Sequence, residues 1–562
     1  MKISKKKFIV LLLCSLIPSI GVCAQVLPDS VMKKVDGLFA KWNTPNTPGC
    51  VIGIVRNDSL IYAKGYGLAN MEYGIPNTPE TIYHMASISK QFTAYAIVLL
   101  AQQGKLKLDD DVRKYLSWFP DLKEKITIRH LLNHTSGVRD QWQLLAISGT
   151  RLDDVIKQEH IVKLLSKQRA LNFKPGDHYT YSNSGFTMLA EIVKSVTGKT
   201  LRQFTDSLIF KPLGMSNTHF HDDYTEVVKN RSYSYFPREG GGFGNSVLSY
   251  SNVGATSLFT NVNDLSKWLI NFYNPKAGTA EDIKLLTQKG KLNNGVESSY
   301  ALGIVVKEFK GWRQYTHNGA DAGYRTFATS FPDLKMGFII FSNVGDFDIG
   351  RKGDELVSLF VKDITKKVNN TVALVIDTSK AVLDDVARAA KFSGNYIADD
   401  GTQFNFKLDY QKLYWERYGH TDLLLKAGKD TFMVADAPNV KFLFDIASSK
   451  ETQVKQWWPD GKRSLLKYSP TANLTDKQLQ AYAGTYYCPE LDCKYGIVLK
   501  GKDLILTNSK YEDTKLQLIG MDHLRSNFWW MGHLKVLRDN KNQIAGFEVN
   551  DGRVMHLRFN KI

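Results

Sequence analysis

Cysteine is scarce in this chain, which has five among its 562 residues. No histidine or further cysteine lies near Cys488 and Cys493 to complete a four-ligand set, so we expect no metal site. The two thiols could instead close a small disulfide loop in an oxidising compartment, and the sequence does not decide whether they pair. Cys50 opens an apolar segment and is expected to be a buried thiol.

Long apolar runs are rare as well. Four lysines stand before the run at residues 8–17, and small residues follow it up to Gln25. This pattern predicts a secretory signal peptide over residues 1–24, and therefore a secreted protein, most simply a periplasmic one. A lipid anchor on Cys23 is the alternative, although Val22 before it is bulkier than that signal usually tolerates. No later run is long enough to span a membrane.

Basic blocks are also absent. The formal net charge is +17, but lysines and arginines are spread along the whole chain. Without a basic block or zinc-finger spacing, nucleic-acid binding is unsupported. The length predicts two to four domains, and a hydrophobic content of 43% is sufficient for a large core.

A serine and a lysine stand three residues apart where an apolar helix is expected to begin. Ser87 and Lys90 precede the apolar run 95–101, so both would lie on one face of a buried helix. A buried amine with a lowered pKa can take the proton of a serine hydroxyl and make it nucleophilic. Taken alone, the pair also fits a helix cap with a solvated lysine, because the same spacing recurs elsewhere in the chain.

Two further short motifs carry polar groups suited to a catalytic cleft. Tyr181 and Asn183 follow a Pro-Gly turn and precede a helix that is expected to end near Gly198. A phenol can relay a proton, and an amide can orient a lysine, although Asn183 also fits a helix cap. His317 and Gly319 lie on a β-rich segment, where a glycine lets another backbone approach the strand closely.

The organisation of the chain changes near Asn369. Before it, β-rich runs early and late in the chain enclose helical segments, which predicts an α/β domain whose sheet is completed by distant strands. After it, short strands and turns dominate, and segments repeat: 392–396 with 482–486, 411–415 with 501–505, and 459–463 with 550–553. The repeats predict two small all-β barrels. The expected domains are 25–370, 385–468 and 474–562.

Together the three motifs resemble those of the penicillin-recognising serine hydrolases, which include class C β-lactamases, D,D-peptidases, D-aminopeptidases and related esterases. The resemblance covers about residues 31–361 and implies an antiparallel sheet flanked by helices, with a helical subdomain. It implies Ser87 as the acylated nucleophile, Lys90 and Tyr181 in proton transfer, and Asn183 in orienting the site. The backbone N–H groups of Ser87 and Ala320 would form the oxyanion hole.

His317 departs from the lysine that class C β-lactamases usually carry at this place. Together with Gly319 it would line the substrate, but a histidine is mostly neutral near pH 7 and attracts a carboxylate weakly. We therefore expect a poor β-lactamase that prefers substrates without a free carboxylate, with Arg325 as a cation able to compensate. The two barrels resemble those of bacterial D-aminopeptidases, and we expect them to shape access to the site.

The resulting hypothesis is a secreted serine hydrolase, without metal or cofactor, that acts on D-amino-acid peptides, amides or esters. Alternatives are a β-lactamase or D,D-carboxypeptidase, an acyltransferase with the same acyl-enzyme, and a penicillin-binding sensor or inactive binding module. The expected partners are small-molecule or peptide substrates. A homo-oligomer is compatible with this hypothesis, and the sequence does not decide the oligomeric state.

Overall fold

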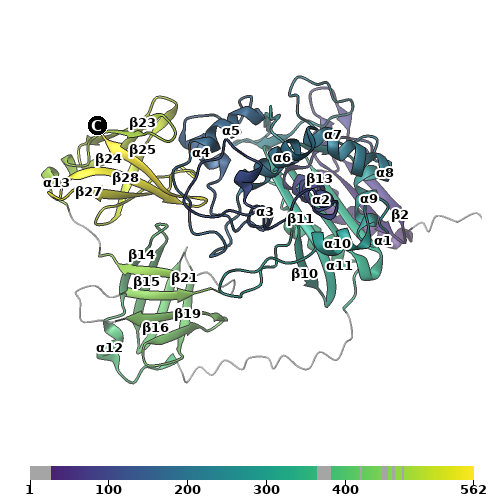
Figure 1. Ribbon diagram of the computed structural model, residues 1–562. Helices are drawn as coiled ribbons and strands as arrows, with labels where there is room; N and C mark the ends of the chain where they lie inside the picture. The colour runs from purple at the N-terminus through teal and green to yellow at the C-terminus, as the bar shows by residue number, and fades with distance from the viewer. Residues whose placement is uncertain (1–26, 364–380, 418–419, 446–452, 459–462, 471–473) are drawn as a thin grey trace, which may run out of the picture.

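The computed structural model describes residues 27–363, 381–417, 420–445, 453–458, 463–470 and 474–562 (Figure 1). The expected signal peptide, including Cys23, and the repeated turn at 459–462 lie outside the described residues. Within those ranges, the longest apolar helices fall short of what a membrane crossing needs.

A six-stranded antiparallel sheet forms the centre of the N-terminal domain, which is the expected catalytic domain. Its strand order is β10 (Val305–Phe309), β11 (Trp312–Asp321), β12 (Tyr324–Phe331), β13 (Met336–Ser342), β1 (Cys50–Arg56) and β2 (Ser59–Tyr66). A hairpin joins β1 to β2 through Asn57 and Asp58, whose φ angles are +47° and +65°. Strands early and late in the chain thus share one sheet, as the sequence predicted.

Both faces of this sheet are covered by helices, so its strands alternate between two apolar clusters. One face packs against α1 (Asp29–Phe39) and α11 (Ile349–Ser358), and the other against α9 (Val262–Asn271). Cys50 is fully buried on β1, as expected.

The remaining helices lie mostly between β5 and β10 in sequence. They are α2 (Ser89–Gln102), α3 (Ile128–Leu132), α4 (Gln141–Ile147), α5 (Gln158–Ser166), α6 (Asn183–Thr197), α7 (Leu201–Thr205), α8 (Lys211–Leu213) and α10 (Ala280–Leu286). Short helical turns cover Ala40–Trp42, Ala86–Ile88, Val112–Lys114, Asp206–Phe210 and Pro332–Leu334. The predicted buried helix after Ser87 is α2, which packs against α6, α7 and α10. The helix predicted after Asn183 is α6, which ends at Gly198 with a φ of +71°.

Further short strands complete the N-terminal domain. Strand β3 (Leu68–Asn70) pairs with β4 (Ile75–Pro76), and β7 (Tyr235–Pro237) pairs with β8 (Phe243–Asn245). Strand β9 (Leu258–Thr260) lies between β5 (Tyr83–His84) and β6 (His219–Phe220) and pairs with both. The glycine-rich segment before residue 245 is therefore the turn of the β7–β8 hairpin.

The C-terminal region forms two closed eight-stranded barrels, which confirms the predicted fold class. Barrel 1 contains β14 (Gly394–Ala398), β15 (Gln403–Asp409), β16 (Lys412–Arg417), β17 (His420–Lys426), β18 (Thr431–Val434), β19 (Ala437–Asp445), β20 (Gln453–Trp457) and β21 (Arg463–Tyr468), after α12 (Val386–Ala390). Barrel 2 contains β22 (Gly484–Cys488), β23 (Cys493–Lys500), β24 (Asp503–Asn508), β25 (Tyr511–Gly520), β26 (His523–Arg525), β27 (His533–Arg538), β28 (Ile544–Asp551) and β29 (Val554–Lys561), after α13 (Asp476–Gln480).

The sequence repeat corresponds to a repeated contact. The hydroxyl of Tyr396 donates to the carbonyl of Phe392 over 3.1 Å, and that of Tyr486 donates to the carbonyl of Tyr482 over 2.6 Å. Each tyrosine thereby joins the first strand of its barrel to the segment before it. Cys488 lies directly opposite Cys493 in the β22–β23 register, and both are thiols in this structure.

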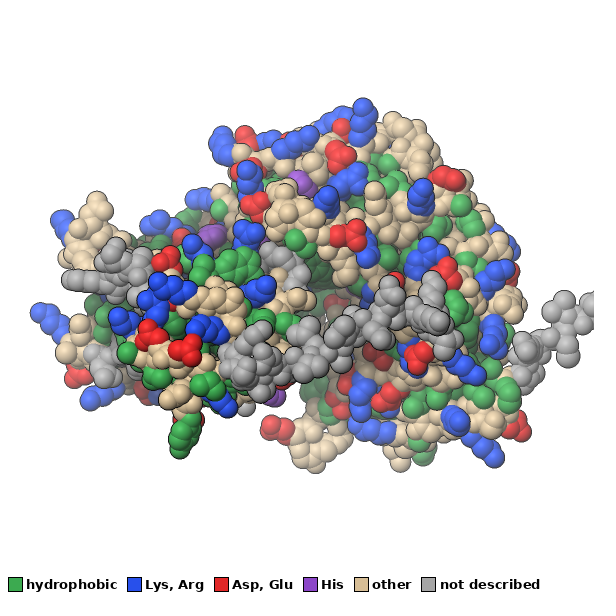
Figure 2. All heavy atoms as spheres, turned by 90° about the horizontal axis from the view of Figure 1, so that it is seen from below, with side chains coloured by type: hydrophobic (Ala, Val, Ile, Leu, Met, Phe, Trp, Pro, Cys, Tyr) green, Lys and Arg blue, Asp and Glu red, His purple; other side chains and the backbone are tan. Residues whose placement is uncertain are grey.

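The two barrels differ in where they attach (Figure 1). Barrel 2 lies against α4, and the buried Leu144 and Ile147 of that helix belong to the apolar core of the barrel. Barrel 1 contacts barrel 2, where Arg525 donates to Gln403 over 2.8 Å. Basic and acidic side chains are interspersed over the face of the molecule that Figure 2 shows, in line with the spread of charge along the sequence.

Candidate active site

Ser87 is presented by a strained turn between β5 and α2. Ala86 before it has a φ of +46°, a left-handed conformation that costs free energy for a residue with a side chain. The backbone N–H of Ala86 donates to His84 Nδ1 over 3.1 Å, and that of Met85 donates to the carbonyl of Leu258 over 2.8 Å. Ser87 is partly exposed although its neighbours on both sides are buried, so the turn offers its hydroxyl to solvent.

Gly319 lets β11 lie against this turn. A Cβ at this position would lie 2.6 Å from the carbonyl oxygen of Met85 and 3.0 Å from the Cβ of Ala86. Thr326, opposite Gly319 on β12, donates to the same Met85 carbonyl over 2.9 Å. The sequence predicted close approach of a substrate at Gly319, and the structure shows that the nucleophile turn itself makes the approach. Ala320 is the next residue along β11.

Lys90 is fully buried and makes three polar contacts. Its Nζ lies 2.8 Å from Asn183 Oδ1, 2.7 Å from the Ala255 carbonyl oxygen and 3.1 Å from Ser87 Oγ. The first two groups only accept hydrogen bonds. A neutral amine donates its two hydrogens to them, and its lone pair is left for the serine hydroxyl.

The environment of Lys90 favours this neutral form. Burial lowers the pKa of its ammonium to about 7, while the negative charges of Asp321 and Asp140 oppose the shift and Arg553 adds to it. A base with a pKa close to neutral combines a sizeable deprotonated fraction with useful basicity. Lys90 therefore has the geometry and the electrostatics of a general base for Ser87.

Asn183 is held in place by a residue that the sequence analysis did not identify. Asp140 Oδ2 accepts 2.8 Å hydrogen bonds from both the backbone N–H and the side-chain amide of Asn183. Its other oxygen caps α4 by accepting from the N–H of Trp142 over 3.0 Å. The side-chain oxygen of Asn183 is thus turned toward Lys90, and a chain of contacts joins Asp140 to the nucleophile.

Tyr181 places its phenol at the same centre. Its ring lies 4.9 Å from Lys90 Nζ and 4.1 Å from the ring of His134, centroid to centroid. Burial raises the pKa of the phenol, and the nearby Ser87 hydroxyl opposes that shift. The hydroxyl is buried and finds no hydrogen-bond partner of good geometry among the described residues. The phenol of Tyr181 is therefore neutral at pH 7 and lies beside Lys90 and the Ser87 hydroxyl.

Both ring nitrogens of His317 form hydrogen bonds with other groups of the protein. Its Nδ1 lies 2.6 Å from the carbonyl oxygen of Asn318, to which it donates, and its Nε2 accepts from the hydroxyl of Tyr300 over 3.0 Å. Burial, followed by the charge of Lys90, lowers the pKa of the imidazole to about 4. His317 is thus neutral at pH 7 and brings no positive charge to a substrate.

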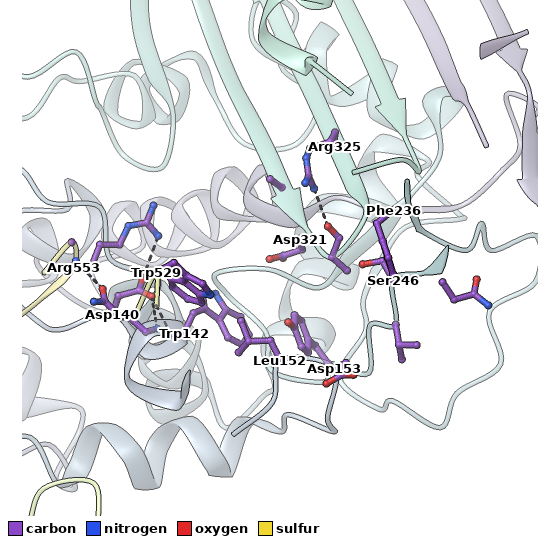
Figure 3. A pocket seen from close by; sticks show the side chains of 17 residues that line it. Asp140, Trp142, Leu152, Asp153, Phe236, Ser246, Asp321, Arg325, Trp529 and Arg553 are labelled. Atoms are coloured by element: carbon purple, nitrogen blue, oxygen red, sulfur yellow. Dashed lines mark hydrogen bonds and ion pairs between the residues drawn. The ribbon is translucent and has the colours of Figure 1, made fainter. Parts of the chain in front are cut away.

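A cavity of about 700 Å³ reaches this centre where Asp140 and Ala320 form part of its wall (Figure 3). The side chains of Ser87, Lys90, Tyr181, Asn183 and His317 are not among those that line it. This volume is typical of small-molecule sites. The cavity is lined by side chains of the catalytic domain and of barrel 2: Asp140, Trp142, Gln143, Leu152, Asp153, Phe236, Asn245, Ser246, Val247, Tyr250, Ala320, Asp321, Ala322, Arg325, Trp529, Gly552 and Arg553. We call this cavity the cleft. The β7–β8 hairpin forms part of its wall through Phe236 and Asn245.

Asp321 directly follows Ala320, whose backbone N–H is expected to contribute to the oxyanion hole. Asp321 lines the cleft and accepts a hydrogen bond from Thr256. Burial raises the pKa of its carboxyl to about 6, against the hydrogen bond from Thr256 and the charge of Lys90. A carboxylate in this place can attract a substrate cation such as an α-ammonium group.

Three residues of barrel 2 reach the cleft: Trp529, Gly552 and Arg553. Arg553 lies with its guanidinium carbon 4.9 Å from the centroid of the Tyr181 ring. The sequence indicates that residues 550–553 belong to a repeated pattern, but no local signal shows where they lie relative to Tyr181. Residues 459–463 carry the same pattern, so the pattern alone does not indicate which of the two copies would reach the cleft.

A possible metal cluster lies outside the cleft. Among the described residues, His219, His221 and Glu226 place ligand atoms within 4.8 Å of one another. Arg202 already donates to both oxygens of Glu226 over 2.6 and 2.8 Å. The guanidinium of Arg202 therefore already pairs with the Glu226 carboxylate, and we assign no function to the cluster.

Comparison with known families gives a match to the β-lactamase family over residues 35–360. That segment contains all three motifs and more than half of the chain. The chain belongs to the β-lactamase family. Its relatives with hydrolase activity identify this chain as a hydrolase. The family match covers its catalytic domain.

Relatives of this β-lactamase-family chain extend into its barrels. It is 26% identical over 468 residues to a D-aminopeptidase of Brucella anthropi, which covers 81% of each chain. It is 26% identical over 417 residues to penicillin-binding protein 4* of Bacillus subtilis, which covers 71% of this chain and 90% of the relative. The octameric penicillin-binding protein homologue from Pyrococcus abyssi has a similar fold, with a TM-score of 0.53, 23% identity and coverage of 78% and 99%.

Proposed function

We propose that this chain is a secreted serine hydrolase that forms an acyl-enzyme at Ser87 with D-amino-acid amides, peptides or esters. The observation that carries the proposal is the geometry of Lys90. Its amine has a pKa of about 7, both of its hydrogens have acceptors, and its remaining contact is the Ser87 hydroxyl at 3.1 Å. This arrangement supports attack by serine on a carbonyl carbon.

The proposed reaction has two halves. Lys90 takes the proton of Ser87 while the serine oxygen bonds to the carbonyl carbon, and the N–H groups of Ser87 and Ala320 stabilise the oxyanion. Tyr181 donates its proton to the leaving nitrogen or oxygen as that bond breaks, and the protonated Lys90 restores the phenol. Water then attacks the acyl-enzyme, with the same groups acting in reverse, and releases the acid.

The preference for D-amino-acid substrates is supported by the Brucella anthropi relative, which is a D-aminopeptidase. Its 468 aligned residues exceed the length of the catalytic domain, so the likeness includes part of the barrel sequence. Trp142, stacked on Tyr250 at 4.8 Å, and Trp529 add aromatic surface suited to an apolar side chain. Asp321 offers a partner for the α-ammonium group of an aminoacyl substrate.

Labelling and turnover test this function together. A serine-directed phosphonate should add its mass to the peptide that contains Ser87, and Ser87→Ala should lose both the label and turnover. Ser246→Ala is the matched control, because Ser246 lines the cleft without contacting Lys90 in the contacts described above. Labelling at another serine, with Ser87→Ala still active, would contradict the proposal.

Substrate choice is tested with D- and L-aminoacyl amides, a simple ester and a chromogenic cephalosporin. We expect multiple turnovers on the D-aminoacyl amide and slow turnover of the cephalosporin. Faster hydrolysis of the cephalosporin would favour a β-lactamase, and transfer of the acyl group to an added amine would favour an acyltransferase. A single turnover followed by a stable acyl-enzyme would favour a sensor.

The proposal also includes secretion and self-association, and each has its own test. Secretion through the signal peptide is tested by cell fractionation and by the N-terminal sequence of the mature protein, expected to begin at Gln25. The Pyrococcus abyssi homologue is octameric, which supports self-association of this chain. Light scattering during gel filtration measures the mass of the assembly.

A further inference from the structure

We propose that Arg553, which barrel 2 places in the cleft, binds a free carboxylate on the leaving group of the substrate. The proposal rests on the proposed acyl-enzyme function and deepens it. It assigns a charged subsite to a residue of the barrel. The substrate class that it favours is a D-aminoacyl residue joined to an amino acid whose own carboxylate is free.

The turn that carries Arg553 is fixed on the catalytic domain by its backbone. The N–H of Arg553 donates to Gln143 Oε1 over 2.9 Å. Its carbonyl oxygen accepts from the backbone N–H of Asp140 over 3.2 Å and from the side-chain amide of Asn172 over 2.8 Å. Gly552 allows the tight turn with a φ of +56°. These contacts set where the side chain begins, so its position in the cleft is a property of the fold.

The guanidinium itself is available for a ligand. Its carbon lies 4.9 Å from the Tyr181 ring centroid, and its Nη1 lies 3.8 Å from Asp140 Oδ2, beyond hydrogen-bond distance. The side chain is 46% exposed. None of the described residues accepts a hydrogen bond from this guanidinium, so its five N–H donors remain for an anion in the cleft.

Asp140 does not satisfy these donors. Its two oxygens already accept from the backbone N–H of Trp142 and Gln143 and from the backbone and side chain of Asn183. Those four hydrogen bonds occupy the lone pairs of the carboxylate. A bidentate pair, which is the strongest geometry for arginine and a carboxylate, is therefore left to the substrate.

Arg325 also lines the cleft, and its Nη1 is occupied by backbone carbonyl groups close to it in sequence. Arg325 donates to the carbonyl oxygens of Ala322 and Tyr324 over 3.0 and 2.8 Å. His317 is neutral and bonded through both of its ring nitrogens. Barrel 2 thus adds the positive charge of Arg553 to a cleft that already contains Arg325.

The place of Arg553 beside Tyr181 selects the leaving-group side. Tyr181 is the proposed proton donor to the leaving nitrogen, and Arg553 lies against its ring. In a peptide, the carboxylate of a leaving amino acid is only a few bonds from that nitrogen. The proposal thus reverses the sequence-based expectation that substrates without a free carboxylate react better.

The test compares two leaving groups that differ only in a carboxylate. D-alanyl 4-nitroanilide and D-alanyl 3-carboxy-4-nitroanilide form one pair, and 4-nitrophenyl acetate with 3-carboxy-4-nitrophenyl acetate forms the second. The measured quantity is the ratio of kcat/KM for the carboxylated and the neutral member, in the wild type, Arg553→Gln, Arg553→Lys and Arg553→Glu. Arg463→Gln, at an exposed position of barrel 1, is the control.

We expect Arg553→Gln to lower this ratio about 10–100-fold, as the loss of a charge-assisted hydrogen bond does, mainly through KM. Arg553→Lys should retain part of the ratio, Arg553→Glu should lower it further, and Arg463→Gln should leave it unchanged. Added salt should reduce the wild-type ratio. An equal ratio in the wild type and all three Arg553 variants, with native circular dichroism, would overturn the proposal.

The two substrate pairs separate this inference from the proposed function. If the D-alanyl anilides do not react but the ester ratio falls in Arg553→Gln, the carboxylate subsite stands and the D-aminoacyl preference fails. If the anilides react but neither ratio responds to Arg553, the D-aminoacyl function stands and the subsite fails.

Discussion

The two barrels share a strand count, a closed topology and a tyrosine contact, yet they relate to the active site in different ways. The core of barrel 1 consists of residues from its own segment, 383–466. The core of barrel 2 also contains Leu144 and Ile147 of the catalytic domain, and its last hairpin reaches Tyr181. A duplicated unit has thus become part of the catalytic domain in one copy and stayed largely separate in the other.

A buried ion pair strengthens the attachment of barrel 2. Arg139 Nη1 donates to both oxygens of Glu490 over 2.6 and 2.8 Å, and both side chains are almost fully buried. Arg139 also donates to the carbonyl oxygens of Met555 and His556. Because Arg139 precedes Asp140, this contact also fixes the residue that orients Asn183.

The largest difference between the barrels should appear in stability. Glu490→Ala leaves the Arg139 charge buried without a partner, which typically costs about 3–5 kcal/mol. Asp430→Ala removes the ion pair with Arg388 inside barrel 1, where the two side chains are 19% and 34% exposed, and should cost much less because solvent screens the pair. Urea unfolding measures both free energies.

A double substitution sharpens this first prediction. Arg139→Met combined with Glu490→Leu removes both charges, so it should recover much of the stability lost in Glu490→Ala. Equal effects of Glu490→Ala and Asp430→Ala would contradict the larger contribution expected from the buried pair of barrel 2.

A core leucine gives the second test. Leu144→Ala should destabilise the protein by about 2–5 kcal/mol, because it opens a cavity between α4 and barrel 2. It should also reduce kcat/KM, since α4 begins at the Asp140 cap. Leu424→Ala opens a similar cavity inside barrel 1 and should leave kcat/KM on a simple ester unchanged. Loss of activity in Leu424→Ala would instead couple barrel 1 to the site.

The comparison also explains what the sequence could and could not predict. Motifs such as Ser87 with Lys90 are local, and helix periodicity places them on one face before any tertiary contact is known. Alternating strands and repeated turns predicted the barrels for the same reason. The hydrogen bond from Asn183 to Asp140 joins residues 43 apart, and the Arg553 N–H bond to Gln143 joins residues 410 apart. Such pairings depend on how domains pack, which a local pattern does not encode.

The third prediction concerns the residue where barrel 2 and the catalytic centre meet. Asp140→Asn places an N–H group against the donors of Asn183, so we expect kcat/KM to fall about 10–100-fold through loss of buried hydrogen bonds. The negative charge of Asp140 raises the pKa of Lys90. Its removal should therefore move the acid limb of the pH–kcat/KM profile below its wild-type position near pH 7. An acid limb that moves upward would contradict this role of Asp140.

The smallest effect is a shift of the same limb in the opposite direction. The positive charge of Arg553 helps to lower the pKa of Lys90, but its effect is smaller than those of burial and of the carboxylates of Asp321 and Asp140. Arg553→Gln should let that pKa rise, so that Lys90 stays protonated to a higher pH and the acid limb moves up. Because Arg553 is half-exposed and screened by solvent, we expect a shift of only about a few tenths of a pH unit. The profile should be measured with the neutral ester at low salt, so that the carboxylate subsite does not contribute. Arg463→Gln in barrel 1 should leave the limb in place, and a shift of equal size in that variant would show that barrel 2 holds no special electrostatic position at the site.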